Sequence, residues 1–167
     1  MAITSISQLK KSLERRIQMA LTRTQKEIYD VVYDYIKQFY KDPAFSPPDV
    51  STPDVYVRTW KFLNSLIKTD VVVTGSNISC SVQLSDDYLE YKYPGNPDWN
   101  GNVPATGLDV ATWANEHGND HTHGYTVSGT SSYVPWWDGA MKELGGKQGI
   151  LNIMKKNLKA VGIPLSK

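Results

Sequence analysis

Residues 70–85 read DVVVTGSNISCSVQLS, and this stretch decides the fold class. Three consecutive valines come first, a Gly-Ser-Asn turn follows at 75–77, and apolar residues then alternate with small polar ones. Alternation with a period of two gives a strand one buried face and one polar face. The stretch therefore predicts an antiparallel β-hairpin with a short glycine-containing loop. In this hairpin the Cys80 thiol shares the core face with Ile78 and Val82.

The chain before the hairpin has the pattern of one long helix. Apolar residues recur at steps of three and four between positions 6 and 39, which places them on one stripe of the helix. Ser5 and Gln8 form a capping box at its start, and Asp42-Pro43 ends it, because a residue before proline disfavours helical backbone. The helix covers about 35 residues, roughly 50 Å. Part of its stripe is therefore expected to pack on something outside its own core.

The whole chain divides by composition into four segments: a long N-terminal helix (1–42), a proline-rich loop (43–54), a sheet with long loops (55–135) and C-terminal helices (136–167). A short helix is expected over 57–66 and a further strand over 88–93. The C-terminal helices are separated at Gly145-Gly146, and the last one is expected from Ile150 to Val161. These elements predict a single α+β domain over residues 1–167, in which the terminal helices cover a small antiparallel sheet.

Composition excludes several classes of protein. The chain has 167 residues, a net charge of +1 and 40% hydrophobic residues, which suits a folded domain with a core. Balanced charge and the lack of a long apolar run predict no membrane partner and no global attraction to nucleic acid. Its single cysteine fits synthesis in a reducing cytoplasm. The nearest basic cluster is interpreted as a solvated helix face, with weak contact to DNA or an acidic partner as the alternative: Lys10, Lys11, Arg15, Arg16 and Arg23.

One cluster has residue types that bind metals: Glu116, His117, Asp120, His121 and His123. A spacing of four would place two of these histidines on one face of a helix. Gly118 and Asn119 lie between them, however, and a flexible loop offers few rigid partners to orient ligands. We interpret the cluster as a solvated or interface loop and expect neither a metal nor another cofactor. No nucleotide-binding glycine pattern or nucleophile elbow is present either, so no catalytic residue and no enzyme is predicted. The alternative is a metal-dependent hydrolase that uses His117, His121 and His123.

Residues 55–66, VYVRTWKFLNSL, resemble a short signature in a family of phage neck proteins, which join the capsid connector to a long tail or complete the tail end. The matching residues are Tyr56, Arg58, Thr59, Leu63, Asn64 and Ser65. The order of elements is also similar, down to Pro135-Trp136-Trp137 before the final helices. Family members often carry a Glu-aromatic-Gly-Thr stretch after the tyrosine strand. This chain instead continues from Glu90 into a long insertion, which leaves its position in the neck open.

The resemblance implies a structural virion protein made of small α+β subunits that assemble into a ring, expected to be sixfold. Its neighbours would be a head-closure or connector protein and a tail tube or tail terminator protein, with DNA only as passing cargo. A minor capsid or tail-terminator protein is the alternative. The loops 93–107 and 116–133 are expected to contact other chains, since both are long and polar yet aromatic. The expected interface anchors are Tyr93, Trp99, Tyr125, Tyr133 and Trp136.

Overall fold

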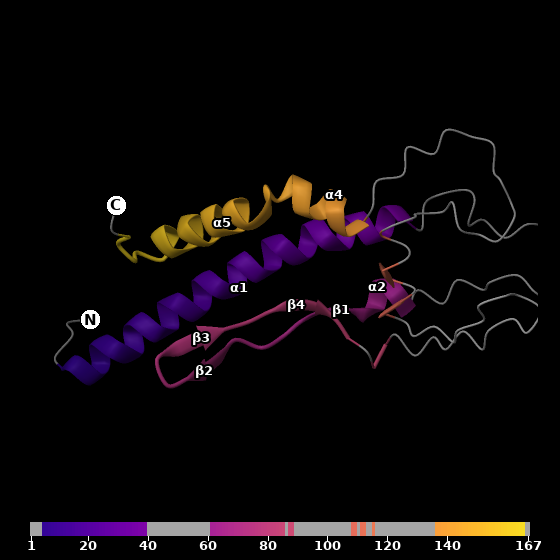
Figure 1. Cartoon of the computed structure of the whole chain (residues 1–167). Coiled ribbons are helices and arrows are strands. Elements are labelled where there is room, and N and C mark those ends of the chain that lie inside the picture. Colours follow the sequence, from indigo (N-terminus) through magenta and orange to yellow (C-terminus); the bar gives the residue numbers. More distant parts are fainter. Residues whose placement is uncertain are drawn as a thin grey trace, which may run out of the picture. The chain divides into compact units, whose positions relative to one another are not determined.

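The computed structural model describes residues 5–39, 61–85, 87–88, 108–109, 111–112, 115 and 136–165. The elements with complete bounds are α1 (Ile6–Phe39), α2 (Lys61–Ser65), β1 (Leu66–Lys68), β2 (Val72–Thr74), β3 (Asn77–Ser79), β4 (Val82–Leu84), α4 (Trp136–Glu143) and α5 (Gly146–Ala160) (Figure 1). The predicted α+β fold class is confirmed. None of the helices in this part of the chain combines the length and the apolar character that crossing a bilayer requires.

Within the predicted single domain, the chain clusters into two compact units. The first unit contains Met1–Val31, Lys68–Gln83 and Lys142–Lys167, and the second contains Val32–Ile67 and Leu84–Met141. Each unit thus combines segments that are far apart in the sequence. Its core depends on contacts that no local pattern specifies.

In the first unit, α1 lies between α5 and the β2–β3 hairpin (Figure 1). The helix begins as predicted, because the hydroxyl oxygen of Ser5 accepts a hydrogen bond from the backbone N–H of Gln8 at 3.2 Å. Ala20 is completely buried. A side chain this small leaves room for neighbouring elements to pack closely on the helix.

The predicted hairpin is present but interrupted. β2 and β3 pair antiparallel, with Val72 opposite Ser79, around a turn in which Gly75 adopts a φ of +63°. β1 and β4 pair in a second ladder, in which the N–H of Thr69 donates to the carbonyl oxygen of Ser81 at 3.0 Å. The registers of the two ladders differ by one position. Two residues, Asp70 and Val71, lie between the ladders on the first side of the hairpin, and one residue, Cys80, lies between them on the other side. Such an extra residue in one strand has the form of a β-bulge and bends the ladder.

The predicted alternation along the second half of the hairpin is confirmed in part. Ile78, Cys80 and Val82 are half-buried and Ser79 and Gln83 are exposed, but Ser81 is half-buried like its apolar neighbours. The first half differs, since Val72 and Val73 both remain exposed. A strand of three residues in a two-stranded sheet has a single covered face, so a run of valines cannot bury every side chain.

The core of the second unit forms around Trp136. Its indole N–H donates to the carbonyl oxygen of Ala111 at 2.9 Å, and its ring meets Phe62 edge-on at 5.3 Å between centroids. Asn115 caps the start of α4, because its side-chain oxygen accepts from the N–H groups of Trp137 and Asp138 at 2.8 and 3.2 Å. The other buried apolar side chains among the described residues of this unit are Val32, Ile36, Leu63, Leu66, Ala111 and Ala140.

Element boundaries in α2 and α5 differ from those predicted. The short helix expected to run to Leu66 ends at Ser65, because Leu66 begins β1 and pairs with β4. The last helix starts at Gly146, four positions earlier than expected. Gly145 and Gly146 adopt φ values of +72° and +61°, so they reverse the chain tightly enough for the helix to begin at once.

Candidate functional site

A polar cluster joins α1 to the strands in the first unit. The side-chain amide of Gln25 donates to the carbonyl oxygens of Thr69 at 2.8 Å and Ser81 at 2.7 Å. The hydroxyl of Thr69 in turn accepts from the N–H of Ser81 at 2.8 Å. Gln25 is only 6% exposed. Its two amide hydrogens therefore satisfy two carbonyl groups at the interruption of the ladder, where backbone pairing changes register.

A second polar cluster joins α1 to α5. The buried amide of Asn157 donates to the hydroxyl oxygen of Thr24 at 3.2 Å and to the carboxylate of Glu27 at 3.0 Å. The ammonium of Lys156 binds the other carboxylate oxygen of Glu27 at 2.5 Å. The hydrogen bonds from Lys156 and then from Asn157 lower the pKa of Glu27 below its ordinary value. The two helices are thus held in one register by directional bonds as well as by apolar contact.

Sequence reasoning missed these residues, although a signal was present. Thr24 and Gln25 occupy the position in the apolar stripe of α1 where the next apolar pair after Leu21 would fall, before Ile28. Asn157 similarly interrupts the stripe of α5 and is its buried residue. A polar residue at an apolar register position is worth treating as a buried hydrogen-bonding group.

The cysteine has a structural environment. Cys80 is half-buried, and its Sγ lies 4.0 Å from the carbonyl oxygen of Leu21. Burial raises the pKa of the Cys80 thiol, which keeps it in the protonated, weakly nucleophilic form. This agrees with the predicted core thiol.

Charge is strongly segregated between the two units. The first unit contains 13 lysines and arginines and 5 aspartates and glutamates, a net charge of +8. The second unit contains 5 lysines and arginines and 12 aspartates and glutamates, a net charge of −7. The overall charge of +1 therefore hides two oppositely charged halves. Composition alone suggested no electrostatic partner, because the segments of each half alternate along the chain.

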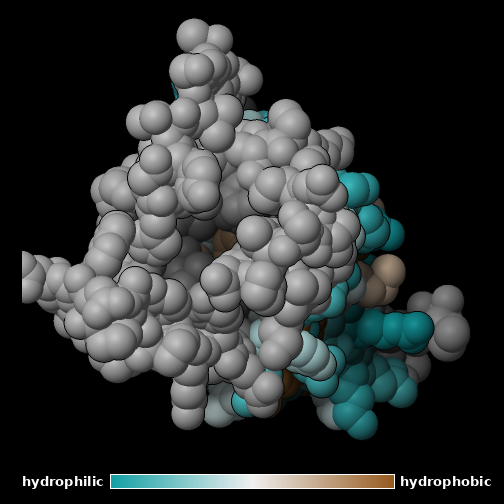
Figure 2. Space-filling model, turned by 90° about the vertical axis from the view of Figure 1, so that its right-hand side faces the viewer, coloured by the Kyte–Doolittle hydropathy of each residue, from teal (hydrophilic) through white to brown (hydrophobic). Residues whose placement is uncertain are grey.

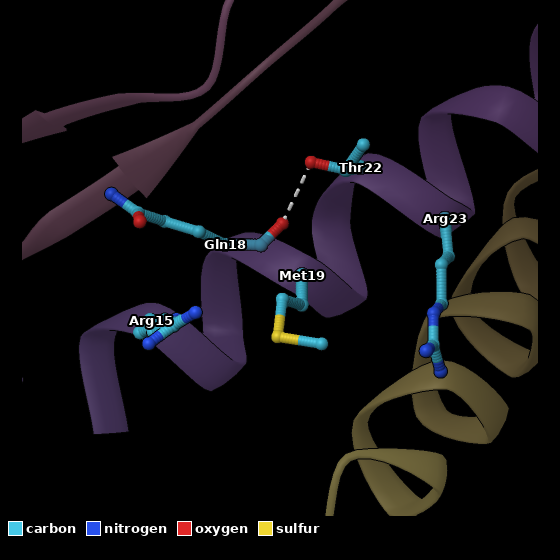
Figure 3. A pocket seen from close by; sticks show the side chains of 5 residues that line it. All are labelled: Arg15, Gln18, Met19, Thr22 and Arg23. Carbon is cyan, nitrogen blue, oxygen red and sulfur yellow. Dashed lines mark hydrogen bonds between the residues drawn. The ribbon is translucent and has the colours of Figure 1, made fainter. Parts of the chain in front are cut away.

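The solvent side of α1 combines basic and apolar residues. Leu9, Leu13 and Met19 are 51%, 45% and 44% exposed. A shallow depression of about 310 Å³ lies beside Met19 and is lined by Arg15, Gln18, Met19, Thr22 and Arg23. Figure 3 shows Met19 between the two arginines along the helix, while the hydroxyl of Thr22 donates to the carbonyl oxygen of Gln18 at 2.9 Å. Leu9 and Leu13 belong to the apolar stripe of α1 that was predicted to pack partly on something outside its own core. The described residues leave this part of the stripe exposed.

The predicted interface anchor Trp136 is buried in its own chain, because its indole fills the core of the second unit. The neighbouring Trp137 has the accessible ring, at 44% exposed. Figure 2 shows a largely hydrophilic surface, with single apolar residues between polar ones, wherever described residues are visible from that side. The other four anchors lie outside the described residues: Tyr93, Trp99, Tyr125 and Tyr133.

The structure describes only part of the segment that resembles the signature of phage neck proteins. Leu63 and Ser65 are buried in the second unit, where the hydroxyl of Ser65 donates to the carbonyl oxygen of Phe62 at 2.7 Å. The carbonyl oxygen of Ser65 accepts from the N–H of Ser85, also at 2.7 Å. Asn64 between them is exposed. These residues support the core, while Tyr56, Arg58 and Thr59 lie outside the described part of the chain.

The candidate metal ligands His117, His121 and His123 also lie outside the described residues. Among the residues that are described, no group of three or more histidine, cysteine, aspartate or glutamate side chains could hold a metal ion. The described part of the chain thus offers buried structural networks and charged, partly apolar surfaces as its candidate functional features.

Comparison with known proteins places this arrangement in a family. No curated protein and no solved structure matches the chain significantly. The chain does match the YomN family over residues 5–160, a range that includes α1, β1 to β4, α4 and α5. YomN is a phage-derived family, and the match points to a phage-encoded protein. Since this match covers nearly the whole chain, the protein belongs to the YomN family.

Proposed function

We propose that this protein is a structural component of the phage particle that acts by binding other chains and not by catalysis. In this role, copies of the chain form a ring, expected to be sixfold, at the neck. The ring joins the capsid connector or head-closure protein to the tail tube or tail terminator protein. Membership of a phage-derived family and the signature around Leu63 to Ser65 support this role.

The observation that carries the proposal is the uncovered side of α1. The helix has 34 residues, and Leu9, Leu13 and Met19 remain exposed on its first half. Exposed apolar side chains that gather on one surface lower the solubility of a protein unless a partner covers them. A protein whose task is assembly has such a partner, and a helix long enough to extend past its own core presents the surface to it.

Inactivation of the gene in the phage tests the role. We expect lysates with filled heads and separate tails, and we expect the intact chain supplied in trans to restore joined particles. Antibody labelling of restored particles should mark the junction of head and tail. Purified chain should form rings in negative stain. Joined, infectious particles without the chain, or purified virions that lack it, would reject the proposal.

A further inference from the structure

We propose that the first unit binds double-stranded DNA through its phosphates, and that the contact surface is a basic face of α1. This basic face consists of Lys11, Arg15, Arg16 and Arg23. The inference goes beyond the proposed neck role and can fail separately from it. In that role DNA passes through the neck as cargo, so a duplex is the polyanion that the protein would meet there.

The positive charge of the first unit lies almost entirely on described residues. They include 12 of its 13 lysines and arginines and all 5 of its aspartates and glutamates. Three of the five carboxylates, those of Glu14, Glu27 and Asp30, already bind lysines. None of the ion pairs found among described residues involves the four side chains of the basic face. Their charge is therefore available to attract a polyanion.

The four basic side chains lie on one surface of the helix. All four are exposed, and at 3.6 residues per turn they fall within about 140° of the circumference and spread over about 18 Å of its length. Figure 3 shows Arg15 and Arg23 on either side of Met19 along the helix. Glu14, the one acidic residue between positions 11 and 23, points to another side of the helix, where it binds Lys10 at 3.7 Å. The face itself therefore contains positive charge only.

Contacts with α5 place one edge of the basic face. A guanidinium nitrogen of Arg16 lies 3.6 Å from the position that a Cβ on Gly162 would take, just beyond the C-terminal end of α5. One turn after Arg23, the carboxylate of Glu27 binds Lys156 of α5. Arg16 and Arg23 therefore lie where α1 packs on α5, on the surface of the folded first unit and not on a free helix end.

The polar groups beside these cations are typical of phosphate contacts. Gln18 and Thr22 line the same shallow depression as Arg15 and Arg23, and arginine, lysine, glutamine and threonine are side chains that contact phosphate oxygens in protein–DNA complexes. Met19 is the one apolar side chain in this depression. The centre of a protein interface is apolar and poor in charged residues, so the composition favours a nucleic acid over a protein partner.

The exposed leucines of α1 belong to a different surface. Leu9 and Leu13 continue the stripe of the buried Ala20, which adjoins the basic face. That stripe stays available to a protein neighbour in the proposed ring while the basic face contacts DNA.

A duplex fits the basic face better than a single strand does. Proteins hold single strands by stacking bases on aromatic side chains, and no aromatic residue occurs between positions 11 and 23. Double-stranded DNA carries one negative charge per about 1.7 Å, so the length of the face spans about ten phosphates. Four cations on a straight helix can thus reach phosphates of a duplex without any contact to its bases.

Binding of the full-length chain to a fluorescent DNA duplex tests the inference, with fluorescence anisotropy as the readout. Four phosphate contacts predict a slope of about −3 to −4 in a plot of log affinity against log salt concentration. We therefore expect the affinity to fall about 100-fold between about 50 and 200 mM salt. Duplexes of unrelated sequence should bind alike, because phosphate contacts carry no sequence information.

Neutral variants locate the contact. Arg15→Gln with Arg23→Gln removes two cations, so we expect the affinity at about 50 mM salt to fall about 100-fold and the slope to become shallower by about 2. Arg15→Lys with Arg23→Lys keeps both charges and should retain the slope. The matched control is Lys155→Gln with Lys159→Gln, which removes the same charge from the same unit. These exposed lysines lie two positions before and after Asn157, on the side of α5 turned away from α1, so the control should bind like the wild type.

The inference is overturned if the wild type does not bind the duplex at low salt. It is also overturned if the control loses as much affinity as Arg15→Gln with Arg23→Gln, because binding would then follow net charge and not the basic face. A glutamine variant that keeps DNA binding but loses binding to poly-glutamate or to phosphatidylglycerol vesicles would make the face a protein or membrane surface. A chain that forms rings at the neck without binding DNA removes this inference and leaves the proposed function. A chain that binds DNA but is absent from virions removes the proposed function and leaves this inference.

Discussion

The side-chain amide nitrogen of Gln25 lies 2.7 Å from the carbonyl oxygen of Ser81, a residue 56 positions further along the chain. With its second hydrogen bond, to Thr69, this amide connects α1 to both strands at the point where their register shifts. An amide is suited to this position because it offers two donors from one nitrogen. The same contact ties the long helix to the hairpin.

Replacement of Gln25 should destabilise the protein. Gln25→Ala removes a donor from the carbonyl groups of Thr69 and Ser81, of which Ser81 keeps the N–H of Thr69, and we expect a loss of about 1–3 kcal/mol in the free energy of unfolding. Gln25→Glu should cost more at neutral pH, because a carboxylate would face two carbonyl oxygens. Urea unfolding followed by circular dichroism measures both. The control is Gln148→Ala, an exposed glutamine on α5. Equal stability of Gln25→Ala and the control would show that the buried amide contributes nothing.

Asn157 should be intolerant of a carboxylate. Asn157→Asp removes the donor to Thr24 and places a negative charge against Glu27, so we expect a loss of about 2–3 kcal/mol. The matched control is Asn152→Asp, which makes the same chemical change at an exposed position of the same helix. Thermal unfolding of the two variants should separate them clearly. Similar melting temperatures would contradict the buried network.

The bond between Glu27 and Lys156 should make stability depend on pH. The folded pKa of Glu27 lies below its ordinary value of 4.5, so its stabilisation is present above pH 4.5 and is lost as the pH falls through the folded pKa. We therefore expect the stability difference between wild type and Glu27→Gln to shrink from pH 7 to pH 3 in urea titrations. Lys156→Gln removes the main cause and should flatten this dependence. A difference that stays constant with pH would argue against the ion pair.

Gly149 should accept no side chain. A Cβ at this position would lie 1.7 Å from the carbonyl oxygen of Leu144, a backbone atom that cannot move away independently. We expect Gly149→Ala to lose about 3 kcal/mol or more. Gly146→Asn serves as the control, because a Cβ there meets nothing within 4 Å and asparagine tolerates a positive φ. If both variants have the same melting temperature, the turn between α4 and α5 is looser than its geometry indicates.

The two adjacent tryptophans should behave differently. Trp136→Phe loses the hydrogen bond to Ala111 and part of the packing against Phe62, so we expect a loss of about 1–3 kcal/mol. Trp137→Phe should leave the stability of the subunit nearly unchanged, because its ring is accessible. Chemical unfolding of both variants gives the comparison. A more destabilised Trp137→Phe would reverse the assignment of core and surface.

Patterns in the sequence predicted much of the fold. The cap at Ser5, the long helix, the turn at Gly75 and the break at Gly145 all appear in the structure. Each depends on backbone preferences or on a periodicity within a few residues. The register shift was missed, because it arises from pairing between strands.

What the sequence by itself determined about this protein is therefore local: which segments are helical or extended, where they turn, and which side of each is apolar. The tertiary structure decided which polar residues are buried and which tryptophan is accessible. Gln25 and Asn157 look like interruptions of an apolar stripe until distant carbonyl and carboxylate groups face them. It also decided the net charge of each compact unit, because folding groups the segments of a nearly neutral sequence into two oppositely charged units. Burial and the charge of each unit depend on which segments meet, and that depends on contacts between segments far apart in the sequence.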